Sequence, residues 1–216
     1  VMILTDGYLA NVSEPWQVPE LDKLKPFDVK FADKKQLADG QFLPYLRRKD
    51  TLARPWGIPG TEGLEHRIGG IEKEDVTGNV SYDPDNHHHM VETRAKKVDT
   101  IAQEFGPTDI FGDVSGDLLI LSWGGTKGSC LSATERLQAD GKKVSHVHLR
   151  WVHPFPNDLG EILIKFKNIL IPEINFGQLI KMIRAEYLVD AKGLNQVRGK
   201  PISSSDIQQA AKDLIG

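Results

Sequence analysis

The stretch GGTKG at residues 124–128 is the first place where this sequence could do chemistry. An apolar run precedes it and a helical pattern follows, as in loops that hold phosphates. Neither phosphate motif fits: Lys127 precedes Gly128 instead of following it, and the three glycines lack the spacing of a dinucleotide loop. What remains is the start of a helix beside Lys127, where free N–H groups and positive charge can attract an anion. An anion contact and a tight structural turn therefore both stay open for Gly124, Gly125, Thr126, Lys127 and Gly128.

A second group of polar residues follows the predicted strands. Ligands of open α/β sheets bind beyond the carboxyl ends of the strands, where residues 124–128, 151–157 and 172–178 should converge. The residues that could form a polar cluster on that edge are His153, Glu173, Asn175 and Gln178. Asn175 and Gln178 also resemble a capping box, and Asn157 could cap a helix. This edge is thus a binding site, a set of caps or a subunit contact.

The histidines do not predict a metal site. Residues 87–89 are three consecutive histidines on a predicted helix, where they point about 100° apart and cannot converge on one ion. His146 and His148 share one face of a predicted strand, without a third acidic or cysteine ligand nearby in sequence. We expect packed histidines there. Glu72, Glu74 and Asp75 look like a solvated charge run, and neither a metal ligand nor a catalytic residue is assigned.

The elements that would position these residues are regular only in the second half. Strands are predicted at 117–123, 143–149, 168–172 and 188–191. A first helix is predicted at 127–139, with Gly141 as its stop signal, and a second is predicted after Asn157, with an apolar face that reaches Phe166. A third is predicted from Asn175 to Tyr187, with Phe176 on its apolar face. The last is predicted to begin at a capping box, Ser205–Gln208. Alternating strands and helices predict an α/β fold: a three-layer α/β/α, mostly parallel sheet.

The first half is irregular and partly helical. Residues 55–70 contain seven Gly or Pro, and residues 12–54 show no sustained period. A helix near 85–105 follows the start signal Asp83–Pro84. Residues 1–4 have the pattern of a buried parallel strand, and such a strand needs neighbouring strands on both edges. We therefore expect the chain to be the C-terminal part of a longer polypeptide; the alternative is an edge strand that begins the domain.

Composition excludes several classes of protein. The 216 residues carry a net charge of −3, which gives no broad basic field for nucleic acid. The apolar runs are only as long as strands, so we expect neither a membrane span nor a signal peptide. One cysteine, Cys130, argues against disulfides and a zinc–thiolate or iron–sulfur site held by this chain alone. We expect a cytoplasmic protein.

Several longer segments resemble one family. TDGYLAN at 5–11, SEPW at 13–16, GLEHRIGGIEKE at 63–74, TGN at 77–79 and YDP at 82–84 carry the resemblance in the first half. HLR at 148–150, PFP at 154–156, PE at 172–173 with Asn175 and GQ at 177–178, and VRG at 197–199 carry it in the second. This pattern is similar to the alpha subunit of 2-oxoacid:ferredoxin oxidoreductases, most closely of the 2-oxoglutarate type.

The resemblance implies oxidative decarboxylation of a 2-oxoacid to an acyl-CoA, with electrons passing to ferredoxin. The holo-complex would use thiamine diphosphate, Mg²⁺, iron–sulfur clusters and CoA, and its other subunits would be a beta subunit and, where present, gamma and delta subunits. It also implies three regions: 1–16 ends a thiamine pyrimidine-binding domain, 17–114 is a connecting segment, and 115–216 is a transketolase C-terminal-like domain. The cofactor-engaging glutamate would lie upstream of Val1, and the chain alone would bind none of these cofactors.

Two function classes follow. One is a structural and interface domain of such an enzyme, inactive in isolation. The other is a stand-alone α/β module that binds a nucleotide or CoA phosphate at residues 124–128.

Overall fold

The computed structural model describes Met2, Ser13 and residues 17–24, 26, 27, 29–67 and 69–216. Apart from Met2, the predicted strand at residues 1–4 therefore lies outside the described residues. The chain separates into two compact units. The first contains Phe105–Gly216 and the second lies within Trp16–Glu104.

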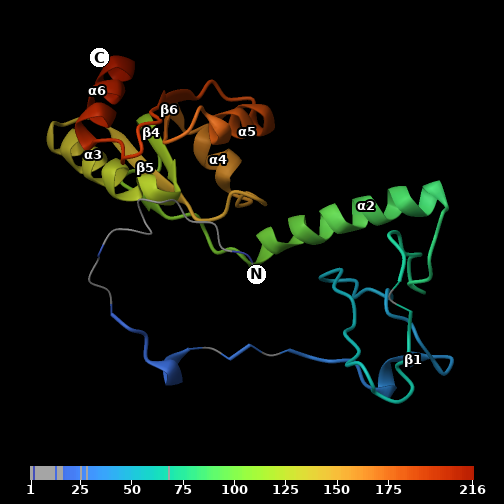
Figure 1. The fold of residues 1–216 in the computed structure, drawn as a ribbon. Coiled ribbons are helices and arrows are strands. Elements are labelled where there is room, and N and C mark those ends of the chain that lie inside the picture. The colour runs from blue at the N-terminus through green and yellow to red at the C-terminus, as the bar shows by residue number, and fades with distance from the viewer. Residues whose placement is uncertain (1, 3–12, 14–16, 25, 28, 68) are drawn as a thin grey trace. The chain divides into compact units, whose positions relative to one another are not determined.

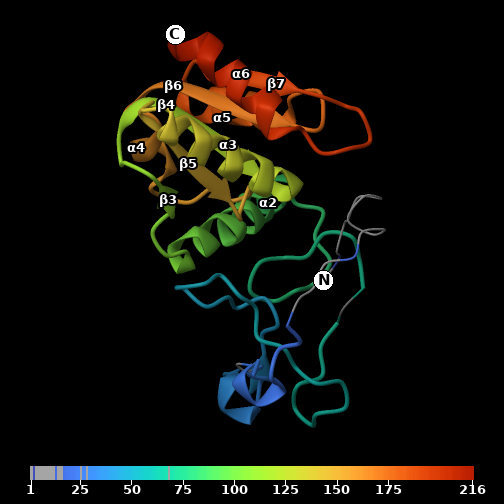
Figure 2. The same ribbon diagram turned by 90° about the vertical axis from the view of Figure 1, so that its left-hand side faces the viewer.

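The first unit is built on a five-stranded sheet in the order β3-β5-β4-β6-β7. The strand bounds are β3 Ile110–Phe111, β4 Gly116–Trp123, β5 Val144–Leu149, β6 Phe166–Glu173 and β7 Lys192–Asn195. The pairs β4–β5, β4–β6 and β6–β7 are parallel, and only β3 runs antiparallel, against β5. The predicted mostly parallel sheet is confirmed, and Figure 2 views it with α3 in front.

Helices cover both faces of this sheet because its central strands are apolar on both sides. Helices α3 (Lys127–Ala139) and α6 (Ser204–Ile215) pack over Leu118 and Ile120. Helices α4 (Leu159–Leu163) and α5 (Gln178–Tyr187) pack over Leu119 and Leu121. Figure 1 shows α4 and α5 on one side of the sheet and α3 and α6 on the other. These four residues of β4 are fully buried, and burying each contributes about 1.5–3 kcal/mol. The predicted three-layer arrangement is therefore confirmed.

Helix α3 has the predicted bounds and the predicted buried residues. Its inward side chains are Cys130, Ala133, Thr134 and Leu137. Gly141 follows with a left-handed φ of 78°, a conformation that glycine adopts without a Cβ penalty and that ends the helix.

Three predicted features near the C-terminus are wrong. The strand predicted at 188–191 is displaced, because Leu188 has a left-handed φ of 52° and caps α5, so β7 begins at Lys192. The last helix is capped by Ser203, whose Oγ accepts a hydrogen bond from Asp206 N at 3.1 Å, and not by Ser205. Phe176 precedes α5 and is 85% exposed, so it does not belong to the apolar face of that helix.

The short helix α4 also differs from its prediction. Its N-cap position is Asp158, not Asn157. The Asp158 carboxylate accepts hydrogen bonds from the backbone N and the hydroxyl of Thr108, at 2.8 and 2.6 Å. Phe166, predicted on the face of this helix, is instead the first residue of β6, because the helix ends at Leu163.

The second unit has little regular structure. It holds the 3₁₀ turns η1 (Leu21–Lys23) and η2 (Lys34–Gln36), the hairpin β1 (Leu37–Ala38) and β2 (Gln41–Phe42), helix α2 (Pro84–Asp99) and turn η3 (Thr100–Glu104). Sequence analysis missed this hairpin, whose core consists of Ala32, Phe42 and Leu64. The predicted helix near 85–105 is confirmed as α2 and η3. Asp83 caps it by accepting hydrogen bonds from two backbone N–H groups.

Helix α2 buries little of its apolar surface. Only Met90 of the helix is buried, and Val91 is 45% exposed. Among the described residues, no helix combines the length and apolar character needed to cross a bilayer.

Candidate functional site

The glycine loop lies at the carboxyl end of β4. Residues Gly124–Thr126 form the 3₁₀ turn η4, and α3 begins at Lys127. Thr126 is buried, and its hydroxyl donates to Trp123 O at 2.8 Å, which closes the turn. Gly124 has a left-handed φ of 56°, although a Cβ there would meet no atom within 4 Å. The backbone conformation therefore favours glycine at this position, whereas packing leaves room for a side chain.

The predicted strand-end polar residues lie around the start of α5. Glu173 is fully buried, and its carboxylate oxygens accept hydrogen bonds from Leu179 N at 2.9 Å and Ile180 N at 3.0 Å. Asn175 Oδ1 accepts from Gln178 N at 2.9 Å. Glu173 and Asn175 thus satisfy the free N–H groups of this helix end. The Gln178 side chain is exposed. His153 is exposed as well, and in the described part of the chain it forms no hydrogen bond or ion pair with Glu173, Asn175 or Gln178.

A serine between two histidines is the polar cluster that sequence analysis missed. The parallel register pairs Ser122 of β4 with His148 of β5. Ser122 Oγ lies 2.7 Å from His146 Nε2 and 2.8 Å from His148 Nδ1. A hydroxyl has one proton, so Ser122 donates to one ring and accepts from the other. The shared face of the two histidines was predicted, and Ser122 could be found only from the register between strands.

Burial keeps both rings uncharged. It lowers the pKa of His146 to about 4, with smaller contributions from the charges of His148 and Lys127. Burial also lowers the pKa of His148, assisted by Lys127 and Arg150. Burial likewise raises the pKa of the neighbouring Cys130 thiol to about 12. These groups are neutral near pH 7, so the cluster is a hydrogen-bonded part of the core and not a charged centre.

A small hollow of about 240 Å³ opens beside His148 at the carboxyl end of β5. Arg150 and the stacked rings of Phe105 and Trp151 contribute to its lining. The two ring centroids are 4.8 Å apart with an interplanar angle of 7°. Trp151 remains 52% exposed, so this edge of the sheet presents an aromatic surface next to a basic one.

The predicted solvated charge run in the second unit is wrong in part. The Glu72 side chain is only 16% exposed and pairs with His87 and with Arg94, the latter at 3.3 Å. Asp75 lies 3.1 Å from His89 Nε2. The hydrogen bond from His87 and then that from Arg94 lower the pKa of Glu72 to about 2. Two of the three consecutive histidines therefore pair with carboxylates from the preceding segment.

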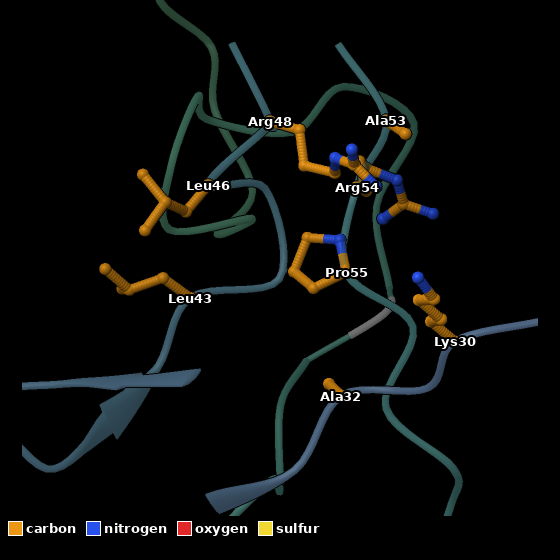
Figure 3. Close-up of a pocket in the computed structure, with 8 residues that line it drawn as sticks. All are labelled: Lys30, Ala32, Leu43, Leu46, Arg48, Ala53, Arg54 and Pro55. Carbon is orange, nitrogen blue, oxygen red and sulfur yellow. The ribbon is translucent and has the colours of Figure 1, made fainter. Parts of the chain in front are cut away.

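A hollow of about 550 Å³ in the second unit surrounds Pro55. Figure 3 shows Leu43 and Leu46 on one side of Pro55 and the nitrogen-bearing ends of Lys30 and Arg54 on the other. An apolar wall faces a cationic wall there. Such a lining suits an amphipathic anion better than a metal ion.

The donor set of the chain does not fit the groups that the family resemblance implies. Among the described residues, no group of three His, Cys, Asp or Glu could hold a metal ion. Cluster ligation needs several thiolates, whereas the one cysteine is buried in α3. Both Glu173 oxygens are engaged by backbone N–H groups. No step through thiamine diphosphate, Mg²⁺ or an iron–sulfur cluster can therefore be assigned to the residues described.

Comparison with known proteins identifies the family. Residues 116–207 match pyruvate:ferredoxin oxidoreductase core domain II. The chain is 41% identical over 208 residues to "2-oxoglutarate oxidoreductase subunit KorA" of Mycobacterium tuberculosis, covering 96% of this chain and 31% of that protein. It is 27% identical over 229 residues to the alpha subunit of 2-oxoacid:ferredoxin oxidoreductase 1 of Aeropyrum pernix, covering 100% of this chain and 34% of that one.

A solved structure shares the fold. The 2-oxoglutarate:ferredoxin oxidoreductase of Magnetococcus marinus, solved with 2-oxoglutarate, coenzyme A and succinyl-CoA bound, matches with a TM-score of 0.81 and 27% identity. The match covers 92% of this chain and 34% of that one. The chain thus spans about a third of the length of the relatives it matches. Over that region, the chain belongs to the family of 2-oxoacid:ferredoxin oxidoreductase alpha subunits.

Proposed function

We propose that this chain is part of the alpha subunit of a 2-oxoglutarate:ferredoxin oxidoreductase. The enzyme would decarboxylate a 2-oxoacid oxidatively, join the acyl group to CoA and pass two electrons to ferredoxin. The observation that carries the proposal is the 41% identity to a 2-oxoglutarate oxidoreductase subunit over 96% of this chain. The shared fold with a structure that holds 2-oxoglutarate and CoA supports it.

Within that enzyme, the chain serves as a structural and interface domain. Three of the strand-end polar side chains are engaged in the fold: Glu173 and Asn175 cap α5, and Thr126 closes η4. The exposed aromatic residues Trp151 and Phe176 at the same edge suit a contact with another part of the enzyme. Thiamine diphosphate, Mg²⁺ and the clusters would be held elsewhere in a cytoplasmic complex with a beta subunit.

The glycine loop could still touch an anion in the complex. Gly124, Gly125, Lys127 and Gly128 are exposed and lie at the start of α3. We propose a contact with a CoA phosphate. Calorimetric titration of CoA into the assembled complex tests it: Lys127→Gln should weaken binding by about tenfold, the loss of one charge-assisted hydrogen bond. Unchanged affinity would exclude the contact.

Isolation of the complex tests the proposed activity. The chain, tagged in its own cells and purified, should bring with it the remaining oxidoreductase subunits. The preparation should reduce a viologen only when 2-oxoglutarate and CoA are both present. Reduction that does not depend on a 2-oxoacid, or isolation of the chain without such subunits, contradicts the proposal.

A further inference from the structure

A cationic hollow in the second unit has no place in the proposed function. It encloses about 370 Å³. Its described lining consists of Tyr45, Arg47, Arg54, Gly70, Ile71, Glu72, Lys73, Arg94 and Lys97. Five of these side chains are cationic and one is a carboxylate, in a chain whose net charge is −3. The positive charge is therefore concentrated locally and is not a property of the whole surface.

A tight turn brings two of the arginines to one aromatic ring. Arg48 N donates to Ala53 O and Leu52 N donates to Arg48 O, both at 3.0 Å, which folds the chain back on itself. As a result, the guanidinium carbons of Arg47 and Arg54 lie 5.7 and 4.3 Å from the centroid of the Tyr45 ring. Both distances are within the range of a cation–π contact.

The Tyr45 ring also lies against a glycine. Gly78 has a left-handed φ of 73°, and a Cβ on it would lie 2.6 Å from Tyr45 Cδ2. Tyr45 N also donates to Val76 O at 3.1 Å. The ring is thus held in place, and the two guanidinium groups have a rigid platform.

Two of the five cations are already compensated within the protein. Arg94 Nη1 donates to Glu72 Oε1 at 3.3 Å, and Lys73 Nζ donates to the carbonyls of Gly69 and Gly70. In the part of the chain that the structure describes, no carboxylate forms an ion pair with the remaining three, Arg47, Arg54 and Lys97.

Arg47 has one satisfied and one unsatisfied N–H group in its guanidinium. One of its N–H groups donates to Leu52 O at 3.0 Å. Its Nε is buried and has no hydrogen-bond partner among the described residues. Burial lowers the pKa of Arg47 because it disfavours the charged form, and the nearby positive charge of Arg54 lowers it further. The charge of Asp75 raises this pKa, but by less than these two effects lower it. A bound anion would offset the repulsion between the two arginines.

We propose that this hollow binds a small phosphate-bearing molecule, with a phosphoryl group between Arg47 and Arg54 and with Lys97 as a further positive charge. Guanidinium groups match the oxygens of phosphate in geometry, and paired arginines favour an anion with more than one charge. The volume is that of a small-molecule site. The proposal is independent of the oxidoreductase activity.

Titration of inorganic pyrophosphate into the full chain, followed by calorimetry, tests the proposal. Acetate at the same ionic strength is the control for unspecific screening. Arg47→Gln with Arg54→Gln should weaken pyrophosphate binding by at least about tenfold, since two charge-assisted hydrogen-bonding groups are lost. Arg48→Gln is the matched control, because Arg48 is already paired with Asp50 at 2.6 Å, and it should change the affinity by less than about twofold.

Amide chemical shifts of the unmodified chain give a second result that does not depend on how the variants fold. Pyrophosphate should shift the amides of residues 45–54 and of Lys97. Absence of binding, shifts confined to other residues, or an affinity unchanged in a folded double variant would overturn the proposal. Arginine-dependent binding of polyglutamate without binding of pyrophosphate would also overturn it and would identify a protein-docking surface instead.

Discussion

Acid should destabilise the first unit through His146. The ring is 3% exposed, and its pKa falls from 6.5 to about 4 on folding. Below about pH 6.5 the unfolded chain binds a proton that the folded chain takes up only near pH 4, so the free energy of unfolding falls as the pH falls through this window. One pKa unit corresponds to about 1.4 kcal/mol, which gives a loss of about 3 kcal/mol between these limits.

Urea unfolding at a series of pH values, followed by circular dichroism, measures this loss. His146→Gln removes the titrating ring and keeps an amide that can hydrogen-bond to Ser122. The unmodified protein should lose about 3 kcal/mol more than this variant between about pH 6.5 and 4, because carboxylates that titrate there are common to both. His153→Gln, at an exposed position, should retain the full loss. Equal pH dependence for the protein and for His146→Gln would refute the reasoning.

Three further substitutions or modifications test individual contacts. Gly124→Ala should lower the free energy of unfolding by about 1 kcal/mol, because Gly124 has a left-handed φ. Gly125 has no such φ and an added Cβ there would meet nothing within 4 Å, so Gly125→Ala should lower it clearly less. Equal losses of stability in urea unfolding would argue against a conformational preference for glycine at residue 124. Glu173→Ala should lower the free energy of unfolding by about 2–4 kcal/mol, because it leaves the buried N–H of Leu179 and the partly buried N–H of Ile180 without acceptors. Glu173→Gln should cost less because one oxygen remains, and the reverse order in thermal unfolding would contradict this account. Cys130 should not react with iodoacetamide until urea unfolds the chain, because burial raises the pKa of its thiol to about 12. Mass spectrometry detects the labelling, and rapid labelling of the folded protein would be inconsistent with that burial.

Features that depend on local sequence were predicted well. Helix α3 has its predicted bounds because an apolar face, a glycine turn before it and Gly141 after it all lie within one short segment. The mostly parallel sheet followed from the alternation of strands and helices. Motifs in both halves of the chain predicted the family resemblance, and the comparisons confirm that resemblance.

Features that depend on the register between distant segments were not predicted. Ser122 lies 24 residues from His146, and only the parallel pairing of β4 with β5 places it between the two histidines. Glu173 was predicted as a site residue, but its two hydrogen bonds exist because α5 folds back over the end of β6. Arg47 and Arg54 meet because of a turn whose residues show no strong turn signal.

The displaced cap and strand near the C-terminus have a simple cause. Leu188 adopts a left-handed conformation that non-glycine residues seldom take, so no propensity indicated that α5 would end there and that the next strand would start at Lys192. Ser203 and Ser205 differ little as N-cap residues, and the choice between them depends on where α6 packs over the sheet.

The central claim is that this chain is a structural domain of a 2-oxoacid oxidoreductase and contributes no catalytic residue. One measurement tests it most directly: viologen reduction with saturating 2-oxoglutarate, CoA, thiamine diphosphate and Mg²⁺, compared between the isolated chain and the complex purified through it. We predict turnover by the complex and none above background by the isolated chain. Turnover by the isolated chain, free of other subunits, would contradict the claim.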